Sequence, residues 1–264
     1  MNDILTVDYG EVCLRTECRF RQTAGFLRAY QKRMEKEILP PLTQTVSGTA
    51  LRMAQGTVKI RKKDVEIIRA YYHTESWDAA IEQSMLAILT SETLMSYDRI
   101  LFHSAAFKWQ GGAYLVAAPS GTGKTTQLCH WLRLYRDEIE IINGDKPLLY
   151  IPEQGIPFVF PSPWNGKEDY GGTAAAPLAG IICLEQGPRN IFEPITVDRA
   201  VDSLFLQFLT FMRTPEQVHT VCRFEERLLR AAPVWKLINT GGPEAAQLAH
   251  DRILSCGGSA EKVR

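Results

Sequence analysis

The 264-residue sequence has no excess of charge of either sign, since 30 Lys and Arg residues balance 30 Asp and Glu residues. A chain without net charge has no overall field to attract nucleic acid or anionic lipid. It also has no long hydrophobic run, because its longest nearly uncharged stretches, such as Ala174 to Leu184, fall well short of the ~18 residues of a membrane span. We therefore expect a soluble, cytoplasmic protein with neither nucleic acid nor membrane as a partner, in which any anion site is local.

Cysteine patterns typical of zinc or disulfide frameworks are also missing. The six cysteines are scattered without a C-x-x-C pair, and Cys13 and Cys18 have no His or Cys partners at zinc-finger spacing. We expect all six to be reduced thiols. The composition, with 45% hydrophobic and 23% charged residues, is that of a globular protein and excludes a disordered chain.

Short apolar segments follow one another after Arg99, and this change in composition divides the chain into two regions. Residues 1–99 are predicted to form an N-terminal α+β region, and residues 100–255 an α/β domain. Residues 256–264 are predicted to be a flexible tail.

In the N-terminal region, apolar and other residues alternate in Thr57–Arg61 and again in Val65–Tyr72, which predicts short antiparallel strands. Phe26–Leu39 carries mixed charges on a helical pattern. A stronger helix is expected to begin after Ser76, a suitable N-cap, and to run to about Met95.

In the second region, the apolar segment Ala113–Ala117 predicts a buried strand, a glycine-rich turn follows, and Lys124 to Tyr135 has the apolar stripe of a helix. The same patterns predict further strands at Ile139–Ile142, Leu148–Ile151, Phe158–Phe160 and Gly180–Leu184, and helices at Val201–Met212, Pro215–Arg230 and Pro243–Leu254.

The strongest chemical signal is the segment Ala118–Thr126, which matches a phosphate-binding loop except that Ala118 replaces the usual first glycine. Such a loop wraps backbone N–H groups around a polyphosphate at a helix N-terminus. The candidate nucleotide-binding residues are Ser120, Gly121, Thr122, Gly123, Lys124, Thr125 and Thr126. Lys124 would counter the β/γ-phosphate charge, and the Thr125 hydroxyl would bind Mg²⁺. A glycine-rich turn that binds nothing is the alternative, and the strand before it and the helix after it favour the phosphate loop.

Asp145 is the second candidate, because it follows an apolar strand about twenty residues after the loop. Its carboxylate could bind Mg²⁺ or accept a proton from an attacking hydroxyl, although Asn143-Gly144-Asp145 is also ordinary turn chemistry. His103 and Lys167 are weaker candidates for charge stabilisation. A lone histidine at a strand end is usually structural, and a loop lysine is usually solvated.

Taken together, these motifs resemble the HPr-serine-kinase-like proteins of bacteria over residues 100 to 255. The matching segments are His103–Ala106, Gly112–Leu115, Ala118–Thr126, Leu128 with Trp131, Asn143–Pro147, Pro163–Lys167 and Pro177–Gln186.

The resemblance implies the mixed-sheet fold shared by HPr kinase and phosphoenolpyruvate carboxykinase. It also implies a kinase that uses ATP or another NTP with Mg²⁺ and phosphorylates a serine-type hydroxyl of a peptide or protein, such as a ribosomally made lasso precursor. By analogy, His103 and Asp145 would approach the γ-phosphate and the acceptor hydroxyl.

Two departures from the family limit this analogy. HPr kinase carries adjacent aspartates after the loop, whereas Gly144 precedes Asp145 here, so one carboxylate would have to serve as base while Thr125 and water hold the metal. The glycine-rich signature that engages HPr and performs phosphorolysis is not recognisable. We therefore expect neither HPr as a substrate nor phosphorylase activity.

Two other functions are compatible with a phosphate loop. A nucleotide-binding regulatory or scaffold protein would keep Lys124 and Thr125 but would not need Asp145. A carboxykinase-like enzyme would call for an arginine-rich carboxylate site and a transition-metal site, and no such spacing is present. The acceptor, the purine preference and the oligomeric state stay open.

The N-terminal region is the candidate for substrate choice. Its basic run, Arg61-Lys62-Lys63, could attract acidic residues of a peptide that adds to an exposed strand. The alternative is that this run is a solvated turn and that residues 1–99 only brace the kinase core.

Overall fold

The computed structural model describes residues 2–31, 42–47, 50 and 62–255. The strand expected at Thr57–Arg61, the side chains of the basic run and the tail 256–264 lie outside the described residues. The described chain is a mixed α/β fold with two sheets, as expected from the sequence.

The smaller sheet is N-terminal and has the order β1-β2-β3. β1 (Asp3–Tyr9) and β2 (Val12–Cys18) form an antiparallel hairpin, and β3 (Leu42–Thr45) pairs with β2 in parallel. One face is buried because Val7, Tyr9 and Leu14 point into the core. The short helix α1 (Arg21–Leu27) and the 3-10 turn η1 (Arg28–Tyr30) follow, and residues 32–39 of the helix expected over Phe26–Leu39 lie outside the described residues.

The strand predicted over Val65–Tyr72 is wrong, because this segment belongs to helix α3 (Lys62–Tyr71). Positions 65, 68 and 72 are apolar at three- and four-residue spacing, which is the helical period, and only Val65-Glu66-Ile67 alternates as a strand would. Ile68, Tyr71 and Tyr72 pack against the N-terminal core. The N-terminal strands instead lie at 3–18, on either side of the Gly10 turn.

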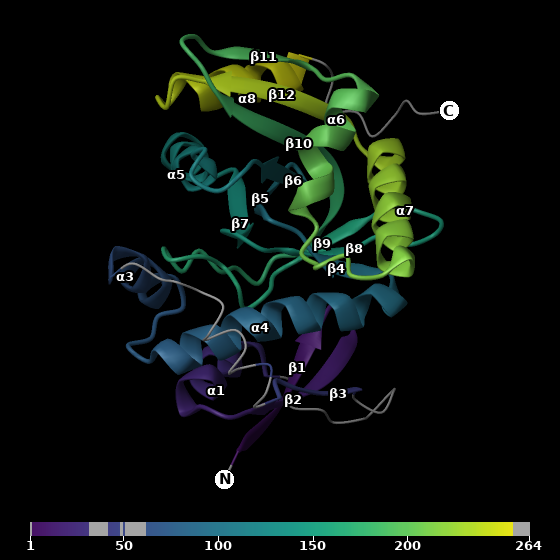
Figure 1. The fold of residues 1–264 in the computed structure, drawn as a ribbon. Coiled ribbons are helices and arrows are strands. Elements are labelled where there is room, and N and C mark those ends of the chain that lie inside the picture. Colours follow the sequence, from purple (N-terminus) through teal and green to yellow (C-terminus); the bar gives the residue numbers. More distant parts are fainter. Residues whose placement is uncertain (1, 32–41, 48–49, 51–61, 256–264) are drawn as a thin grey trace.

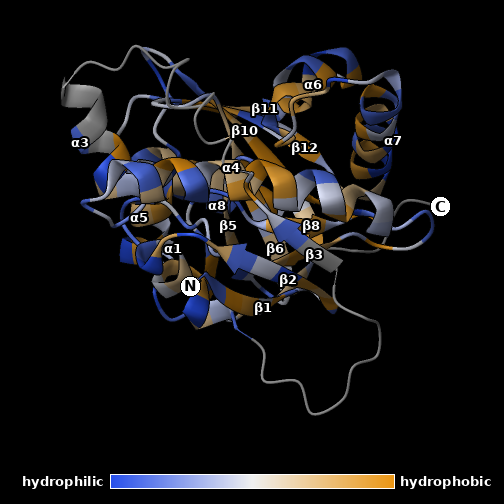
Figure 2. Cartoon of the chain, turned by 60° about the horizontal axis from the view of Figure 1, so that its bottom comes forward, coloured by the Kyte–Doolittle hydropathy of each residue, from blue (hydrophilic) through white to orange (hydrophobic). Residues whose placement is uncertain are grey.

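The long helix α4 (Trp77–Leu94) confirms the prediction made from Ser76, whose hydroxyl accepts a hydrogen bond from the Ala79 N–H at 3.2 Å. A 3-10 turn, η2 (Met95–Tyr97), extends it. Figure 1 shows α4 between the two sheets, and Figure 2 shows hydrophobic residues at many positions along it. It therefore packs on both sides.

The larger sheet has nine strands and is mixed. Its order is β4-β8-β9-β10-β6-β5-β7, and β12 pairs with β10 and with β11. The strands are β4 (Arg99–Leu101), β5 (Ser104–Trp109), β6 (Gly112–Ala117), β7 (Ile139–Asn143), β8 (Leu148–Tyr150), β9 (Phe158–Phe160), β10 (Ala176–Gln186), β11 (Ile191–Pro194) and β12 (Val234–Asn239). β6 runs parallel to β10 and antiparallel to β5, which separates β6 from β7.

Helices cover both faces of this sheet. α5 (Lys124–Leu134) and α8 (Glu244–Ser255) share one hydrophobic cluster with β5 and β6. On the other face lie α6 (Val197–Leu204), the 3-10 turn η3 (Phe205–Gln207) and α7 (Pro215–Ala231), which pack around Phe224 and Leu228. In the described part of the chain, no helix is long and apolar enough to cross a membrane.

The N-terminal region and the larger sheet share a hydrophobic core. Leu101, Leu148 and Trp164 belong to the same buried cluster as Tyr9 and Leu86. The Trp164 indole N–H donates to the Gln83 carbonyl at 3.0 Å, and the Trp164 side chain is 1% exposed. Side chains that precede Arg99 in the sequence and side chains that follow it therefore bury one another.

Candidate functional site

The candidate phosphate-binding loop lies between β6 and α5, as a glycine-rich turn from a buried strand into a helix. Gly121 and Gly123 have φ angles of +82° and +110°, in the left-handed region that favours glycine. A side chain at Gly121 would meet no heavy atom within 4 Å, so packing does not dictate this glycine. The loop ends at the N-terminus of α5, whose first N–H groups have no helical acceptors.

Lys124 lies on the first turn of α5 and is 6% exposed. Its ammonium donates to the carbonyls of Ala118 and Pro119, at 2.8 and 3.3 Å. Burial lowers the pKa of Lys124 to about 8, and the nearby charge of Asp145 partly opposes this shift. The ammonium is thus largely removed from water, so a bound anion would stabilise its charge.

Asp145 is positioned by a buried asparagine at the end of β7. The Asn143 Oδ1 accepts hydrogen bonds from the backbone N–H groups of Asp145 and Lys146, at 2.9 and 2.7 Å. The Asn143 Nδ2 donates to the Ser162 carbonyl at 3.0 Å. The segment is therefore the turn that its composition suggested, and the same turn presents a carboxylate.

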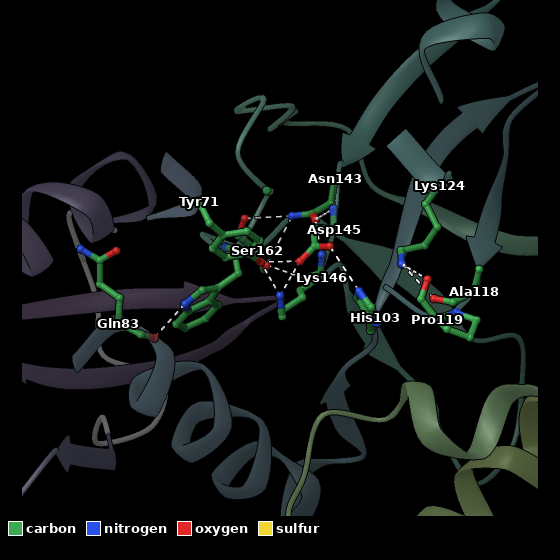
Figure 3. A network of polar contacts seen from close by, with 12 residues as sticks. Tyr71, Gln83, His103, Ala118, Pro119, Lys124, Asn143, Asp145, Lys146 and Ser162 are labelled. Atoms are coloured by element: carbon green, nitrogen blue, oxygen red, sulfur yellow. Dashed lines mark hydrogen bonds and ion pairs between the residues drawn. The ribbon is translucent and has the colours of Figure 1, made fainter. Parts of the chain in front are cut away.

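Both oxygens of the Asp145 carboxylate have partners (Figure 3). The His103 Nε2 lies 3.4 Å from Oδ1. The Lys146 ammonium and the Tyr71 hydroxyl both donate to Oδ2, and Lys146 also donates to the Tyr71 oxygen. The side chains of Asp145 and Lys146 are each 15% exposed, so this network is largely shielded from water.

The electrostatic environment keeps Asp145 ionised. Burial by itself raises the pKa of Asp145, but the hydrogen bond from His103 and the charge of Lys146 outweigh it and hold the pKa well below its usual range. Burial, followed by the charge of Asp145, raises the pKa of Tyr71 well above its ordinary value. Tyr71 therefore stays protonated as a donor to the carboxylate.

Gln207, on η3, connects His103 to the phosphate loop. With its amide nitrogen turned toward them, Gln207 donates to the His103 Nδ1 and to the Ala118 carbonyl, each at 3.2 Å. We orient the amide this way because the reverse would set its oxygen against two carbonyl oxygens. An Nδ1 that accepts leaves the proton of neutral His103 on Nε2, which faces Asp145.

The other candidate residues differ in where they lie. Ser120 and Thr126 are exposed on the loop and the first turn of α5, and Thr122 donates to the Pro119 carbonyl at 2.9 Å. Lys167 has a side chain 61% exposed, and its ammonium lies 3.4 Å from Glu168. The structure therefore pairs Lys167 with Glu168 rather than with Asp145.

Gly144, which stands where the resemblance would place a second aspartate, is required by close packing. An added Cβ would lie 2.5 Å from the Asn165 carbonyl oxygen and 3.0 Å from the Tyr170 Cβ. The first of these contacts is closer than real Cβ atoms allow. A second carboxylate therefore has no room beside Asp145.

Magnesium fits part of this site. Thr125 is half-buried at the start of α5, where its hydroxyl would be available to a metal beside bound phosphates. Asp145 would also have to release Lys146 or Tyr71 to act as a ligand, because both occupy Oδ2. Among the described residues, no group of three or more His, Cys, Asp and Glu side chains could hold a metal ion. A metal would thus rely mainly on Thr125 and the nucleotide.

Sequence reasoning missed three residues of the site. Lys146 is next to Asp145 and carried a visible signal, a cation directly after the strand-end carboxylate. Tyr71 lies 74 residues before Asp145 in the sequence, and Gln207 lies 104 residues after His103. No motif in either segment indicates a functional residue.

Comparison with known proteins adds little to this picture. No family model and no curated protein matches the chain. One similar solved structure is that of the Hpr(Ser) kinase/phosphatase from Coxiella burnetii, which is 14% identical. The match covers 61% of this chain and 99% of that one, with a TM-score of 0.25. This similarity is too low to assign the chain to a family.

Proposed function

We propose that this protein is a kinase that transfers the γ-phosphoryl group of ATP to a serine-type hydroxyl of a peptide or protein. The observation that carries this proposal is an ionised, shielded carboxylate connected to a phosphate loop through His103 and Gln207. A protein that only binds or senses a nucleotide needs the loop but not the Asp145 network. The tailoring of a ribosomally made peptide, which the sequence resemblance suggested, is part of this proposal.

The loop side of the site supports binding of the polyphosphate. Backbone N–H groups of residues 120–125 and the N-terminus of α5 would surround the β- and γ-phosphates. Lys124 would leave the Ala118 and Pro119 carbonyls and bind phosphate oxygens, a change that its desolvation favours. Mg²⁺, when bound through Thr125, would neutralise charge that develops between the β- and γ-phosphates.

The carboxylate side supports the transfer step. The acceptor oxygen forms a bond to the γ-phosphorus, the bond from that phosphorus to the β,γ-bridging oxygen breaks, and ADP leaves with the electron pair. The acceptor proton passes to the Asp145 carboxylate. Because a lowered pKa makes Asp145 a weak base, its main role is to orient the hydroxyl and to take the proton late, as a loose transition state allows.

Tyr71 would have to give way in this reaction. Its hydroxyl donates to the Asp145 Oδ2, which is the contact that an acceptor hydroxyl would make. We therefore take the Tyr71 oxygen as an indicator of where the acceptor hydroxyl binds. His103 would hold the other carboxylate oxygen throughout the step.

The test uses γ-labelled ATP, Mg²⁺ and a library of serine-containing peptides, with the transferred label located by mass spectrometry. We expect Asp145→Asn to bind ATP as the parent does and to lower the transfer rate by about a hundredfold, the range for loss of a general base. Lys124→Ala should abolish ATP binding in calorimetry. ATP binding without transfer to any peptide would instead favour the nucleotide-binding regulatory or scaffold function.

A further inference from the structure

A cavity of 730 Å³ lies between the N-terminal region and the loop that follows β9. It is lined by the β1–β2 turn, by α1 and η1, by His73, and by residues 160–175 on the opposite side. Its volume is in the range of binding pockets for small molecules and side chains. None of the residues assigned above to the phosphate loop or to the Asp145 network lines it.

The cavity adjoins the Asp145 side of the active site. His73 lines the cavity, and its Nε2 lies 3.2 Å from the Gly166 carbonyl. A Cβ placed on Gly166 would lie 3.3 Å from the Asp145 Cβ, so the backbone at Gly166 packs directly on the carboxylate residue. Asn165 lines the cavity and precedes Gly166 in the chain. Only the backbone of the loop at Asn165 and Gly166 therefore separates the cavity from Asp145.

The lining combines aromatic rings with carboxylates. Phe26, Tyr30 and Phe160 supply the rings. Asp8, Glu11 and Asp169 supply the carboxylates, and among the described residues that line the cavity none is lysine or arginine. Burial, with the charge of Asp169 as the next contribution, raises the pKa of Tyr30 to about 12, so its ring stays neutral. Rings and carboxylates together are suited to an organic cation.

The acidic rim is held in place by the fold. Arg99 donates through Nε and Nη2 to the Gly10 carbonyl, at 2.9 and 2.6 Å, and so fixes the turn that carries Glu11. On the other rim, Asp169 accepts a hydrogen bond from the Asn165 side chain at 2.8 Å. These contacts fix the turn before Glu11 and the Asp169 carboxylate at one cavity before any ligand binds, and the Arg99 guanidinium interacts with the charges of Glu11 and Asp8.

Resting on the proposed function, we propose that this cavity binds a lysine or arginine side chain of the acceptor peptide, next to the hydroxyl that is phosphorylated. The charge of the cavity is opposite to that of the run Arg61–Lys63, from which an acidic substrate was expected. The residue that enters the cavity would lie close in the peptide to the serine at Asp145, because only the Asn165–Gly166 backbone intervenes.

The experiment measures binding by fluorescence anisotropy, without nucleotide. The probes are two labelled nine-residue peptides of Gly and Ala around a central Ser, one with Lys and one with Glu on both sides of it. We expect the Lys peptide to bind at least about tenfold more tightly than the Glu peptide, from two ion pairs and a cation–π contact. This preference should weaken as salt screens the carboxylates.

Two double variants decide whether the cavity is responsible. Glu11→Gln with Asp169→Asn removes both rim charges while keeping their shapes, and it should reduce the preference to below about threefold. Asp137→Asn with Glu153→Gln makes the same change in net charge at exposed positions outside the cavity and should keep the preference. Absence of a preference in the parent, or an equal preference in both double variants, overturns the proposal.

A labelled-ATP assay on the same peptides separates this proposal from the proposed function. If the Lys peptide binds through the rim carboxylates but is never phosphorylated, the cavity assignment holds and the kinase assignment fails. If the Lys and Glu peptides are phosphorylated with equal kcat/KM, the kinase assignment holds and the cavity assignment is wrong.

Discussion

The lowered pKa of Lys124 predicts how nucleotide affinity depends on pH. With a pKa of about 8, the ammonium is protonated in about 76% of free molecules at pH 7.5 and in about 3% at pH 9.5. If ATP binds only the protonated form, its apparent Kd should rise about 25-fold over this range. The sign follows because the bound polyphosphate raises the pKa of Lys124, so binding takes up a proton that becomes scarcer as the pH rises.

Calorimetric titration with ATP and Mg²⁺ at pH 7.5, 8.5 and 9.5 measures this dependence directly. Performed in two buffers with different ionisation enthalpies, it also counts the protons taken up on binding. Lys124→Arg is the matched control, because an arginine stays charged over the whole range. The variant should bind ATP with a Kd that varies by less than about threefold between pH 7.5 and 9.5.

Two results would refute the reasoning. The first is a Kd for the parent that is as flat as that of Lys124→Arg. The second is an equally steep rise in both proteins, which would assign the proton to another group. In either case the proton on Lys124, which donates to the Ala118 and Pro119 carbonyls, does not set the pH dependence of nucleotide binding.

Three further predictions concern two other site residues and the shared core. Tyr71→Phe removes a hydrogen bond to the ionised Asp145 carboxylate, worth about 1.5–3 kcal/mol, and should raise ATP hydrolysis in the absence of acceptor by at least about tenfold. A slower hydrolysis in a steady-state phosphate assay would show that Tyr71 assists the reaction instead. Gln207→Met keeps the side-chain length but removes the hydrogen bond to the His103 Nδ1. We expect kcat for peptide phosphorylation to fall about tenfold and its pH profile to shift, while the ATP Kd stays within twofold. If neither kcat nor the pH profile changes, Gln207 has no positioning role. Trp164→Ala should lower the free energy of unfolding by about 3–5 kcal/mol in urea denaturation, and a loss below about 1 kcal/mol would mean that the two regions do not share their core.

Sequence reasoning worked best where the signal was local. The loop at 118–126, the Ser76 cap and the strand before Asp145 each depend on a few neighbouring residues, and the structure has the corresponding elements. The strand β12 was missed because Val234–Asn239 is short and lies between two stronger helical patterns. The helix at 62–71 was mistaken for a strand because the alternation of Val65-Glu66-Ile67 was given more weight than the three- and four-residue spacing that continues to Tyr72.

The candidate site was predictable only in part, because its network joins distant segments. Asp145 and His103 were identified from strand ends, and the pairing of β5 with β7 brings them together. Tyr71 reaches Asp145 from a helix in the N-terminal region, and Gln207 reaches His103 from a 3-10 turn. Such contacts depend on packing between segments, which one sequence without its fold does not display.

The core shared across Arg99 has a consequence for how the chain folds during synthesis. The N-terminal segments leave the ribosome first, but their hydrophobic cluster also needs Leu148 and Trp164, the latter synthesised 65 residues after Arg99. At about 5–20 residues per second, the nascent chain spends roughly 3–13 s with one side of α4 uncovered. A slow stretch of codons before Trp164 would lengthen this interval and expose the chain to chaperones and to aggregation.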